Sequence, residues 1–472
     1  MSRRLRTASV TAAVALTTLP GAASAHGLVG KQDLPIPRWL FAWGAAVVLV
    51  VSFVGLAVLW PKPWLEGARE RRVVALPVAR EIVFGALGVA AFAVSVYAGF
   101  AGVDSPTANL LPTVVYVVFW VGIPFASLLL GEVFAPFNPW RAVARAGAWA
   151  FGRTRGEAPA PLAYPAWLGQ WPAAIGILAF AWLELVYANK DDPSVLAVLA
   201  LAYAAVQLVG MSLFGITAWE RNADAFGVYF GFLGRLSPLH WRRRGLSLRP
   251  ALAGVAAIVP VAGTAALLCV AIGTTSFDGM SQGAIWTGPE GIAPGLQDRF
   301  VNLGFTGETA LQITFTIGLV AMVGIVAGVF RLGVLGMRSV DPSHSAAQLA
   351  RTFAPSLVPI ALAYVVAHYF SLLVYQGQAM AYLISDPLGH GSNLFGTASR
   401  SIDYSVIGAN GVWYVQVAAL VTGHAAGLAL AHDRALVVYD DPRAATRSQY
   451  WMLAVMVGFT SLGLFILSAA AQ

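Results

Sequence analysis

Residues 352–376 read TFAPSLVPIALAYVVAHYFSLLVYQ and contain no Asp, Glu, Lys or Arg. A hydrocarbon core about 30 Å thick needs roughly 20 apolar residues in an α-helix, so this stretch is long enough to cross a bilayer. The whole chain shares this character, because 58% of its 472 residues are hydrophobic and only 11% are charged. This composition excludes a single soluble domain and predicts an all-α polytopic membrane protein.

Ten stretches of this kind follow one another along the chain. Their expected boundaries are 39–60, 82–102, 111–130, 171–188, 194–217, 251–273, 308–331, 352–376, 411–431 and 450–470. Of the 29 Lys and Arg residues, 21 lie in every second gap and only five in the alternate gaps. Cationic residues concentrate in cytoplasmic loops, so this alternation predicts ten transmembrane helices with both mature termini outside the cytoplasm. We therefore expect a multi-pass protein of the plasma membrane.

The distribution of charge argues against a nucleic-acid-binding protein, and the cysteine content excludes a disulfide-stabilised or cysteine-metal protein. The net charge of +7 does not indicate nucleic-acid binding, because the basic residues border apolar spans. The cytoplasmic bias of cations and their attraction to anionic lipid account for them, with the lipid bilayer as the expected partner. The single cysteine, Cys269, excludes an intrachain disulfide and a cysteine-based metal cluster.

The first 25 residues have the parts of a secretory signal peptide. Three arginines precede an apolar stretch at 10–19, and the Ala-Ser-Ala sequence ending at Ala25 fits a cleavage site. Cleavage there leaves His26 at the mature N-terminus and a single membrane domain at 26–472.

Ionisable groups inside apolar spans are costly, so each one is a candidate functional residue. In the eighth span Tyr364, His368, Ser371 and Tyr375 recur at helical spacing and share one face. His368 falls in the outer half, where it fits a ligand or a general base facing an outward-open cavity; a histidine that packs against a neighbouring helix is the alternative. Glu184 in the fourth span reaches a similar depth, and fits an orienting carboxylate or a second ligand of one metal.

Two segments expected outside the membrane, 274–307 and 377–410, are too long for simple turns, and such loops are usually functional or disordered. Asp386 and His390 lie four residues apart in the second segment, on the same side as His26. An exposed amine and imidazole at His26 would chelate a divalent metal such as copper. These three residues are therefore candidate metal ligands.

Unusual motifs are spread over nearly the whole chain. They include HGLVG at 26–30, DLPIP at 33–37, NPWR at 138–141, SDPLG at 385–389 and HDRA at 432–435. In these motifs the chain resembles the polytopic actinobacterial proteins known as fenitrothion hydrolases. The resemblance implies cleavage of an organophosphorus triester, such as fenitrothion, at its aryl leaving group. It transfers no established catalytic residues.

These observations leave three functions open. In the first, a neutral apolar triester enters from the outer leaflet and meets Tyr364, His368 and Glu184 as catalytic residues, with His26, Asp386 or His390 adding metal ligands. The second is a multi-span transporter of a small solute or ion, which suits polar residues near mid-depth. The third is an extracytoplasmic copper-handling protein.

Overall fold

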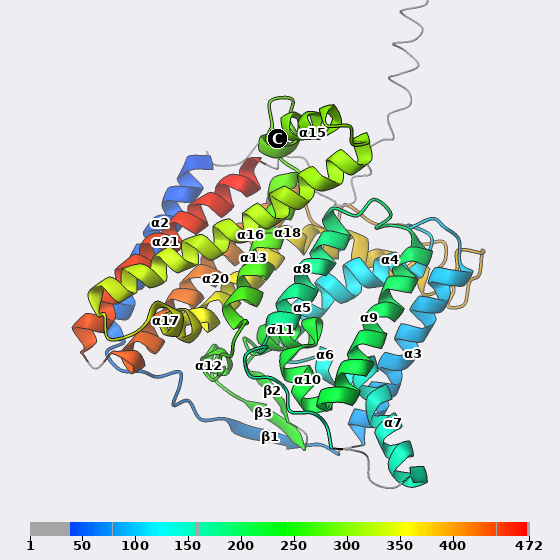
Figure 1. The fold of residues 1–472 in the computed structure, drawn as a ribbon, viewed down its shortest axis with the longest axis horizontal. Coiled ribbons are helices and arrows are strands. Elements are labelled where there is room, and N and C mark those ends of the chain that lie inside the picture. The colour runs from blue at the N-terminus through cyan, green and yellow to red at the C-terminus, as the bar shows by residue number, and fades with distance from the viewer. Residues whose placement is uncertain (1–37, 78, 156–159, 243, 440, 470–472) are drawn as a thin grey trace, which may run out of the picture.

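The structure, a computed structural model, describes residues 38–469 except residues 78, 156–159, 243 and 440 (Figure 1). The predicted signal peptide, 1–25, and His26 lie outside the described residues. The longer helices are α2 (Arg38–Leu59), α3 (Arg80–Ala101), α7 (Pro139–Arg155), α8 (Trp171–Leu185), α9 (Pro193–Phe214), α13 (Thr264–Ser281), α16 (Gly307–Val340), α18 (Val358–Gln376), α20 (Ala409–Val438) and α21 (Pro442–Ala469).

Shorter elements connect and extend these helices. Residues 110–130 form α4 (Leu110–Thr113), the π-helix η1 (Val114–Gly122) and α5 (Ile123–Leu130) in sequence. The others are α6 (Phe134–Phe137), α10 (Ile216–Asn222), α11 (Ala225–Gly234), α12 (Ala253–Ala256), α14 (Ala284–Thr287), α15 (Ile292–Asn302), α17 (Ala346–Phe353), η2 (Ala354–Leu357), η3 (Gly377–Ala379) and α19 (Met380–Leu383). Three strands, β1 (Arg71–Ala75), β2 (Leu239–Arg242) and β3 (Gly245–Leu248), form one antiparallel sheet in the order β1-β3-β2.

Six helical segments are long and apolar enough to cross a membrane. They are Arg80–Ala101, Leu110–Leu130, Pro193–Phe214, Gly307–Val340, Ala346–Leu383 and Ala409–Val438. Their surfaces, and that of α2, expose many large apolar side chains, among them Val54, Val58, Val206 and Val209. Contiguous apolar surface of this kind is stable in lipid rather than in water. The structure thus confirms a helical protein of the membrane class, with a small sheet that the sequence pattern did not predict.

Each predicted span overlaps a helix, but the sixth is displaced. The expected span was 251–273, whereas α13 begins at Thr264 and runs through Ser281. Gly263 immediately before it has φ +83°, a left-handed conformation that glycine adopts readily, so the helix begins only after this turn. Part of the segment expected as an outer loop, 274–307, is therefore helical. The C-terminal part of α13, from Thr274 to Asp278, is mostly polar but buried by neighbouring helices, so the helix continues there despite its polar sequence.

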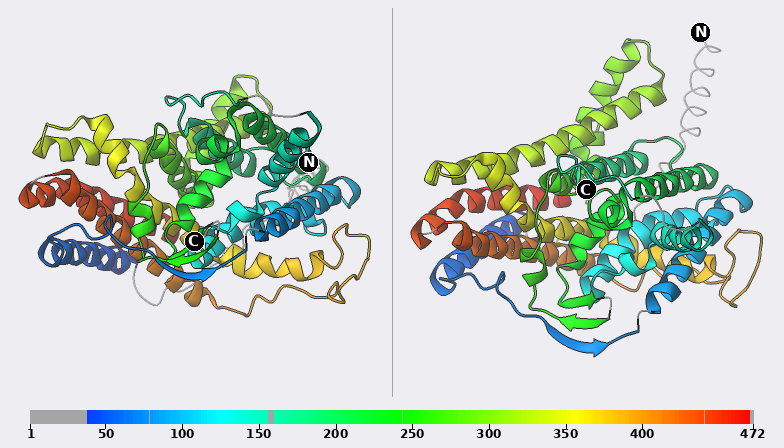
Figure 2. Two further views of the ribbon diagram at one scale, coloured as in Figure 1. Left: turned by 90° about the horizontal axis from the view of Figure 1, so that it is seen from below. Right: turned by 60° about the horizontal axis from the view of Figure 1, so that its bottom comes forward.

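Helices α13 and α18 occupy the middle of the molecule (Figures 1 and 2). On one side α16, α20, α21 and α2 pack together, and on the other side lie α3, α9 and α8. Helix α13 contacts both α8 and α16, while α18 contacts both η1 and α20. Side chains on the two central helices are consequently surrounded by protein on both sides.

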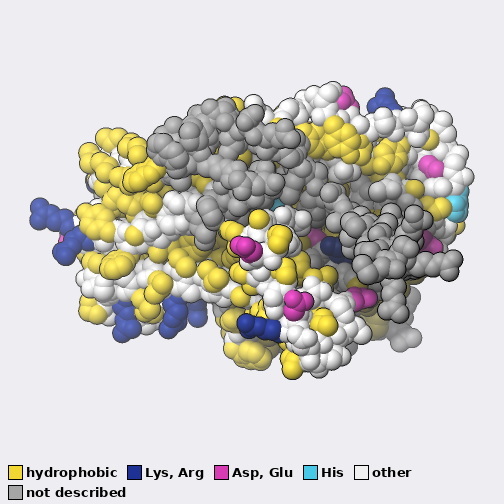
Figure 3. Space-filling view, turned by 90° about the horizontal axis from the view of Figure 1, so that it is seen from above, with side chains coloured by type: hydrophobic (Ala, Val, Ile, Leu, Met, Phe, Trp, Pro, Cys, Tyr) yellow, Lys and Arg dark blue, Asp and Glu magenta, His cyan; other side chains and the backbone are white. Residues whose placement is uncertain are grey.

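The connecting segments gather at two opposite ends. The sheet, α12 and α17 lie at the lower end in Figure 1, whereas α15 and the irregular segment 384–408 lie at the upper end. Figure 3 views the molecule from above, where acidic side chains and several Lys and Arg side chains lie among hydrophobic and uncharged atoms. The sheet carries several of the arginines that mark every second gap in the sequence.

A buried aspartate organises the lower part of the bundle. Asp224 precedes α11 and accepts four hydrogen bonds: from Asn138 Nδ2 (2.9 Å) and Trp140 Nε1 (2.7 Å) at Oδ2, and from Tyr203 OH (2.9 Å) and Gly227 N (3.1 Å) at Oδ1. The carboxylate thereby joins α7, α9 and α11, and Asp224, Asn138 and Trp140 are buried. The NPW motif at 138–140 is explained by this contact.

Glu220 in α10 lies beside this junction, with Arg141 Nε 3.2 Å from its Oε1. Burial raises the pKa of Glu220 to about 7, and the charge of Arg141 offsets only part of that effect. A carboxyl whose pKa is raised on folding contributes stability below its ordinary pKa of 4.5, and this contribution is lost as the pH rises through about 7.

We therefore expect Glu220→Gln to gain stability relative to the wild type as the pH rises from 5 to 8, by about 2–3 kcal/mol, because glutamine stays neutral. The measurement is the apparent melting temperature of the detergent-solubilised protein across this range. Glu308→Gln, at an exposed carboxylate in the first turn of α16, serves as the control and should follow the wild-type profile. Parallel pH profiles for Glu220→Gln and the wild type would contradict the prediction.

Candidate functional site

A histidine and an aspartate meet in the buried centre of the molecule. His368 Nε2 on α18 lies 2.8 Å from Asp278 Oδ2 on α13, and the Tyr369 hydroxyl donates a hydrogen bond to the same oxygen at 2.8 Å. The side chain of Asp278 is 0% exposed and that of His368 is 9% exposed. An ionisable pair buried this deeply in an apolar bundle is a functional candidate by default.

The geometry of α18 explains how two neighbouring residues reach one carboxylate. Consecutive residues on an α-helix point about 100° apart, so Asp278 lies between the directions of His368 and Tyr369. The rings of these two residues are in edge contact, with centroids 4.6 Å apart. Trp120, from the π-helix η1, lies beside the Tyr369 hydroxyl. π-Helical segments are rare and frequently occur at functional sites.

Glu184 is a second buried carboxylate at this site. It lies near the end of α8, close enough to Asp278 and to Lys190 for electrostatic interaction with both. The Tyr116 hydroxyl, also from η1, donates to the Lys190 carbonyl at 2.7 Å and so ties η1 to the segment that follows α8. Asp278 thus pairs with His368 and interacts electrostatically with Glu184, the two residues expected to meet.

Tyr364 lies one helical turn from His368, about 6 Å along the axis, and is buried. It contacts Ser276, two residues before Asp278, and its ring centroid is 6.1 Å from that of His424 on α20. The structure therefore places Tyr364 on the same side of α18 as His368, facing α13 and α20.

Two of the three candidate metal ligands, Asp386 and His390, lie in segment 384–408. Asp386 accepts hydrogen bonds from the backbone N–H groups of His390 (3.1 Å) and Gly391 (2.7 Å), which closes a turn in segment 384–408. His390 is exposed, and His26 lies outside the described residues. Among the described residues, no group of three or more His, Cys, Asp or Glu side chains is placed to hold a metal ion. The donor set at His368 therefore gives no support for a metal there.

Sequence reasoning missed Asp278 because the sixth span was expected to end at residue 273. The signal was present in the run Thr274-Thr-Ser-Phe-Asp278, since these residues continue the helix without a Gly-Pro break. A hydropathy criterion ends a span where polar residues begin, whereas a helix enclosed by other helices continues through them.

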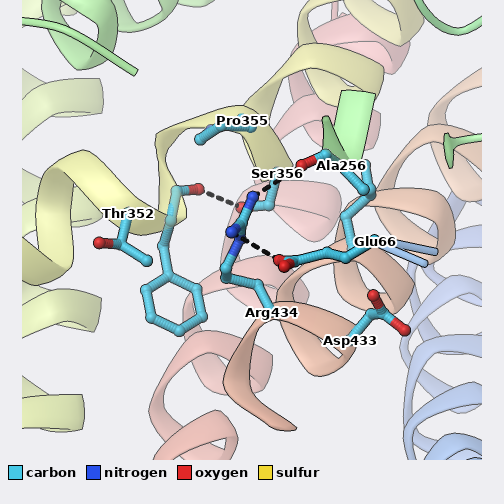
Figure 4. A pocket seen from close by; sticks show the side chains of 9 residues that line it. Glu66, Ala256, Thr352, Pro355, Ser356, Asp433 and Arg434 are labelled. Carbon is cyan, nitrogen blue, oxygen red and sulfur yellow. Dashed lines mark hydrogen bonds and ion pairs between the residues drawn. The ribbon is translucent and has the colours of Figure 1, made fainter. Parts of the chain in front are cut away.

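A second polar cluster lies at the other end of α20 (Figure 4). Asp433 Oδ1 accepts hydrogen bonds from Trp60 Nε1 (3.0 Å) and Trp64 N (2.6 Å), and both carboxylate oxygens lie 3.2 Å from Leu65 N. Arg434 turns away from Asp433, and its NH1 pairs with Glu66 Oε1 at 2.5 Å. These contacts fix the chain between α2 and β1 against α20.

No known protein family, curated protein or solved structure matches this chain. Function therefore has to be argued from the chemistry of the site.

The His368–Asp278 pair is equipped for proton transfer. The carboxylate places the Nε2 proton on the side of Asp278 and stabilises the imidazolium that forms when Nδ1 takes up a second proton. The Tyr369 hydroxyl donates a hydrogen bond to the same carboxylate oxygen. The arrangement thus contains the acidic and basic groups that binding and releasing a proton require.

Proposed function

We propose that the chain crosses the plasma membrane ten times, with the signal peptide removed and both mature termini outside the cytoplasm. The overlap of each predicted span with a helix supports this topology, as does the gathering of basic connecting segments at one end of the bundle. On this orientation the sheet faces the cytoplasm, and His368 lies in the outer half of the membrane.

We propose that the protein moves protons across the membrane together with a small solute or ion. The observation that carries the proposal is the fully buried Asp278 carboxylate, paired with His368 and hydrogen-bonded by Tyr369 inside an apolar bundle. Chains of Asp, Glu and His side chains in membrane spans are typical of proton relays in pumps and transporters.

Further polar groups continue in both directions from this pair. Towards the outer end lies Glu184, and towards the cytoplasmic end follow Tyr364 and His424. His424 Nδ1 lies 2.8 Å from the Leu420 carbonyl, and Asp433 follows about 14 Å further along α20. Between His424 and Asp433 a proton would need water molecules as carriers.

The test uses protein reconstituted into vesicles with an imposed pH gradient and a trapped pH-sensitive dye, with the membrane potential clamped. The collapse of the gradient is recorded with buffer alone and with a pooled low-molecular-mass cell extract on one side. We expect collapse faster than in protein-free vesicles in at least one condition. Rates equal to those of protein-free vesicles in both conditions would contradict proton movement.

Hydrolysis of a neutral phosphotriester is a second candidate, supported by the resemblance and by an imidazole that a carboxylate orients, as in general-base catalysis. His368 would take a proton from water, the hydroxide would attack phosphorus, and the aryl oxide would leave. The release of nitrophenolate from a nitrophenyl phosphotriester, in detergent and without a pH gradient, distinguishes this candidate from transport. Copper handling rests on His26 together with Asp386 and His390; metal analysis of the purified protein tests it.

A further inference from the structure

The sheet at the basic end has two chemically different faces. Antiparallel pairing places Arg72 opposite Ser247 and His240 opposite the same serine, so these residues share one face. Arg242, two residues after His240, lies on that face too, because side chains alternate along a strand. The other face carries Val74 and Trp241, both paired with Leu246.

The polar face borders a basic cavity of about 560 Å³. Its lining residues are Arg69, Glu70, Arg72, Arg242, Arg244, Gly245 and Ser247. Part of this set holds the sheet together, since Arg72 NH2 donates to the Arg244 carbonyl at 2.7 Å and Arg242 NH2 lies 3.1 Å from Glu70 Oε2. Four guanidinium groups against one carboxylate leave the cavity with a net positive charge. Guanidinium groups suit the planar, bidentate recognition of phosphate.

The opposite face of the sheet is apolar and aromatic. Val74 and Trp241 are exposed there, and the Arg80 guanidinium lies 5.5 Å from the centroid of the Trp241 ring. Arg80 begins α3, whose first turns expose further large apolar side chains. Aromatic rings beside cations are typical of the headgroup level of a membrane, with apolar helix surface continuing towards the acyl chains.

We propose that this cavity binds the phosphate of an anionic phospholipid headgroup in the cytoplasmic leaflet. A lipid is favoured over a soluble phosphate because the Arg80 side chain donates a hydrogen bond to the carbonyl of Arg242, which lines the cavity. The exposed apolar side chains of Ile82 and Val83, in the first turn of α3, therefore begin beside the cavity. The two parts of the sheet are far apart in sequence, so the cavity exists only when β1 pairs with β3. Bound lipid would hold these segments together at the membrane surface.

The experiment is native mass spectrometry of the full-length protein in detergent. Phosphatidylglycerol and phosphatidylcholine with identical acyl chains are titrated separately, and inorganic phosphate is added as a competitor. The test variant is Arg69→Gln with Arg244→Gln, and the control is Arg338→Gln, an exposed arginine in the last turn of α16 outside the cavity. Size-exclusion chromatography and circular dichroism verify folding; Arg69→Gln alone replaces the double variant if the latter is aggregated.

We expect phosphatidylglycerol to bind at least about tenfold more tightly than phosphatidylcholine, with this preference lost in the test variant and retained in Arg338→Gln. Equal binding of the two lipids would overturn the proposal. So would equal weakening in the control, which would indicate a diffuse charge effect. Displacement of the lipid by millimolar inorganic phosphate would overturn it as well, since the cavity would then select a soluble anion.

Discussion

Replacement of Asp278 by Asn should abolish proton movement while leaving the protein folded. Asparagine retains an oxygen that accepts from Tyr369 OH and can lie beside His368 Nε2, but it cannot ionise or stabilise an imidazolium. Acid–base groups of this kind contribute about 10²–10⁴-fold to a rate. We therefore expect gradient collapse in vesicles to slow by at least about 100-fold, to the protein-free rate within error.

Two comparisons separate this effect from a structural one. Glu308→Gln removes an exposed carboxylate from the upper end of the bundle and should behave as wild type. Asp278→Ala, which leaves His368 and Tyr369 without their shared acceptor, should lower stability by about 3–5 kcal/mol, as expected when one partner of a buried pair is removed. A folded Asp278→Asn protein with wild-type proton flux would remove this pair from the mechanism.

Replacement of Asp224 by Ala should be among the most destabilising single changes in the chain. Four donors would lose their acceptor at once: the buried side chains of Asn138 and Trp140, and the partly buried Tyr203 hydroxyl and Gly227 N–H. An unsatisfied buried polar group costs about 1–3 kcal/mol, so even the lower value predicts a total loss of about 4 kcal/mol. At roughly 2 °C for each kcal/mol, the apparent melting temperature in detergent should fall by about 8 °C.

Asp192→Ala provides the matched control. Asp192 also precedes a helix and accepts backbone N–H groups, those of Ser194 and Val195, but it does so at a partly exposed position where water replaces the lost acceptor. Its loss should therefore lower the melting temperature much less than the loss of Asp224. Equal shifts for the two alanine variants would show that burial of the Asp224 network contributes nothing beyond an ordinary helix cap.

The candidate site was predicted in part. The spacing of Tyr364 and His368 and the lone Glu184 were visible because an ionisable residue in an apolar run stands out against its neighbours. Asp278 was not visible, since it sits in a polar stretch that resembles a loop. Asp224 was hidden for a related reason: its partners come from residues 138, 140 and 203, and no local pattern links residues so far apart in sequence.

The amino-acid sequence by itself determined the membrane class, the approximate positions of the helices and the segregation of arginines to alternate connections. These properties follow from hydropathy and charge, which act locally along the chain. Only the tertiary structure decided that α13 extends to Ser281, that Asp278 is the carboxylate beside His368, and that β1 and β3 together build a basic cavity. Packing decides such contacts, because surrounding helices can bury a polar helix end and pair its charges.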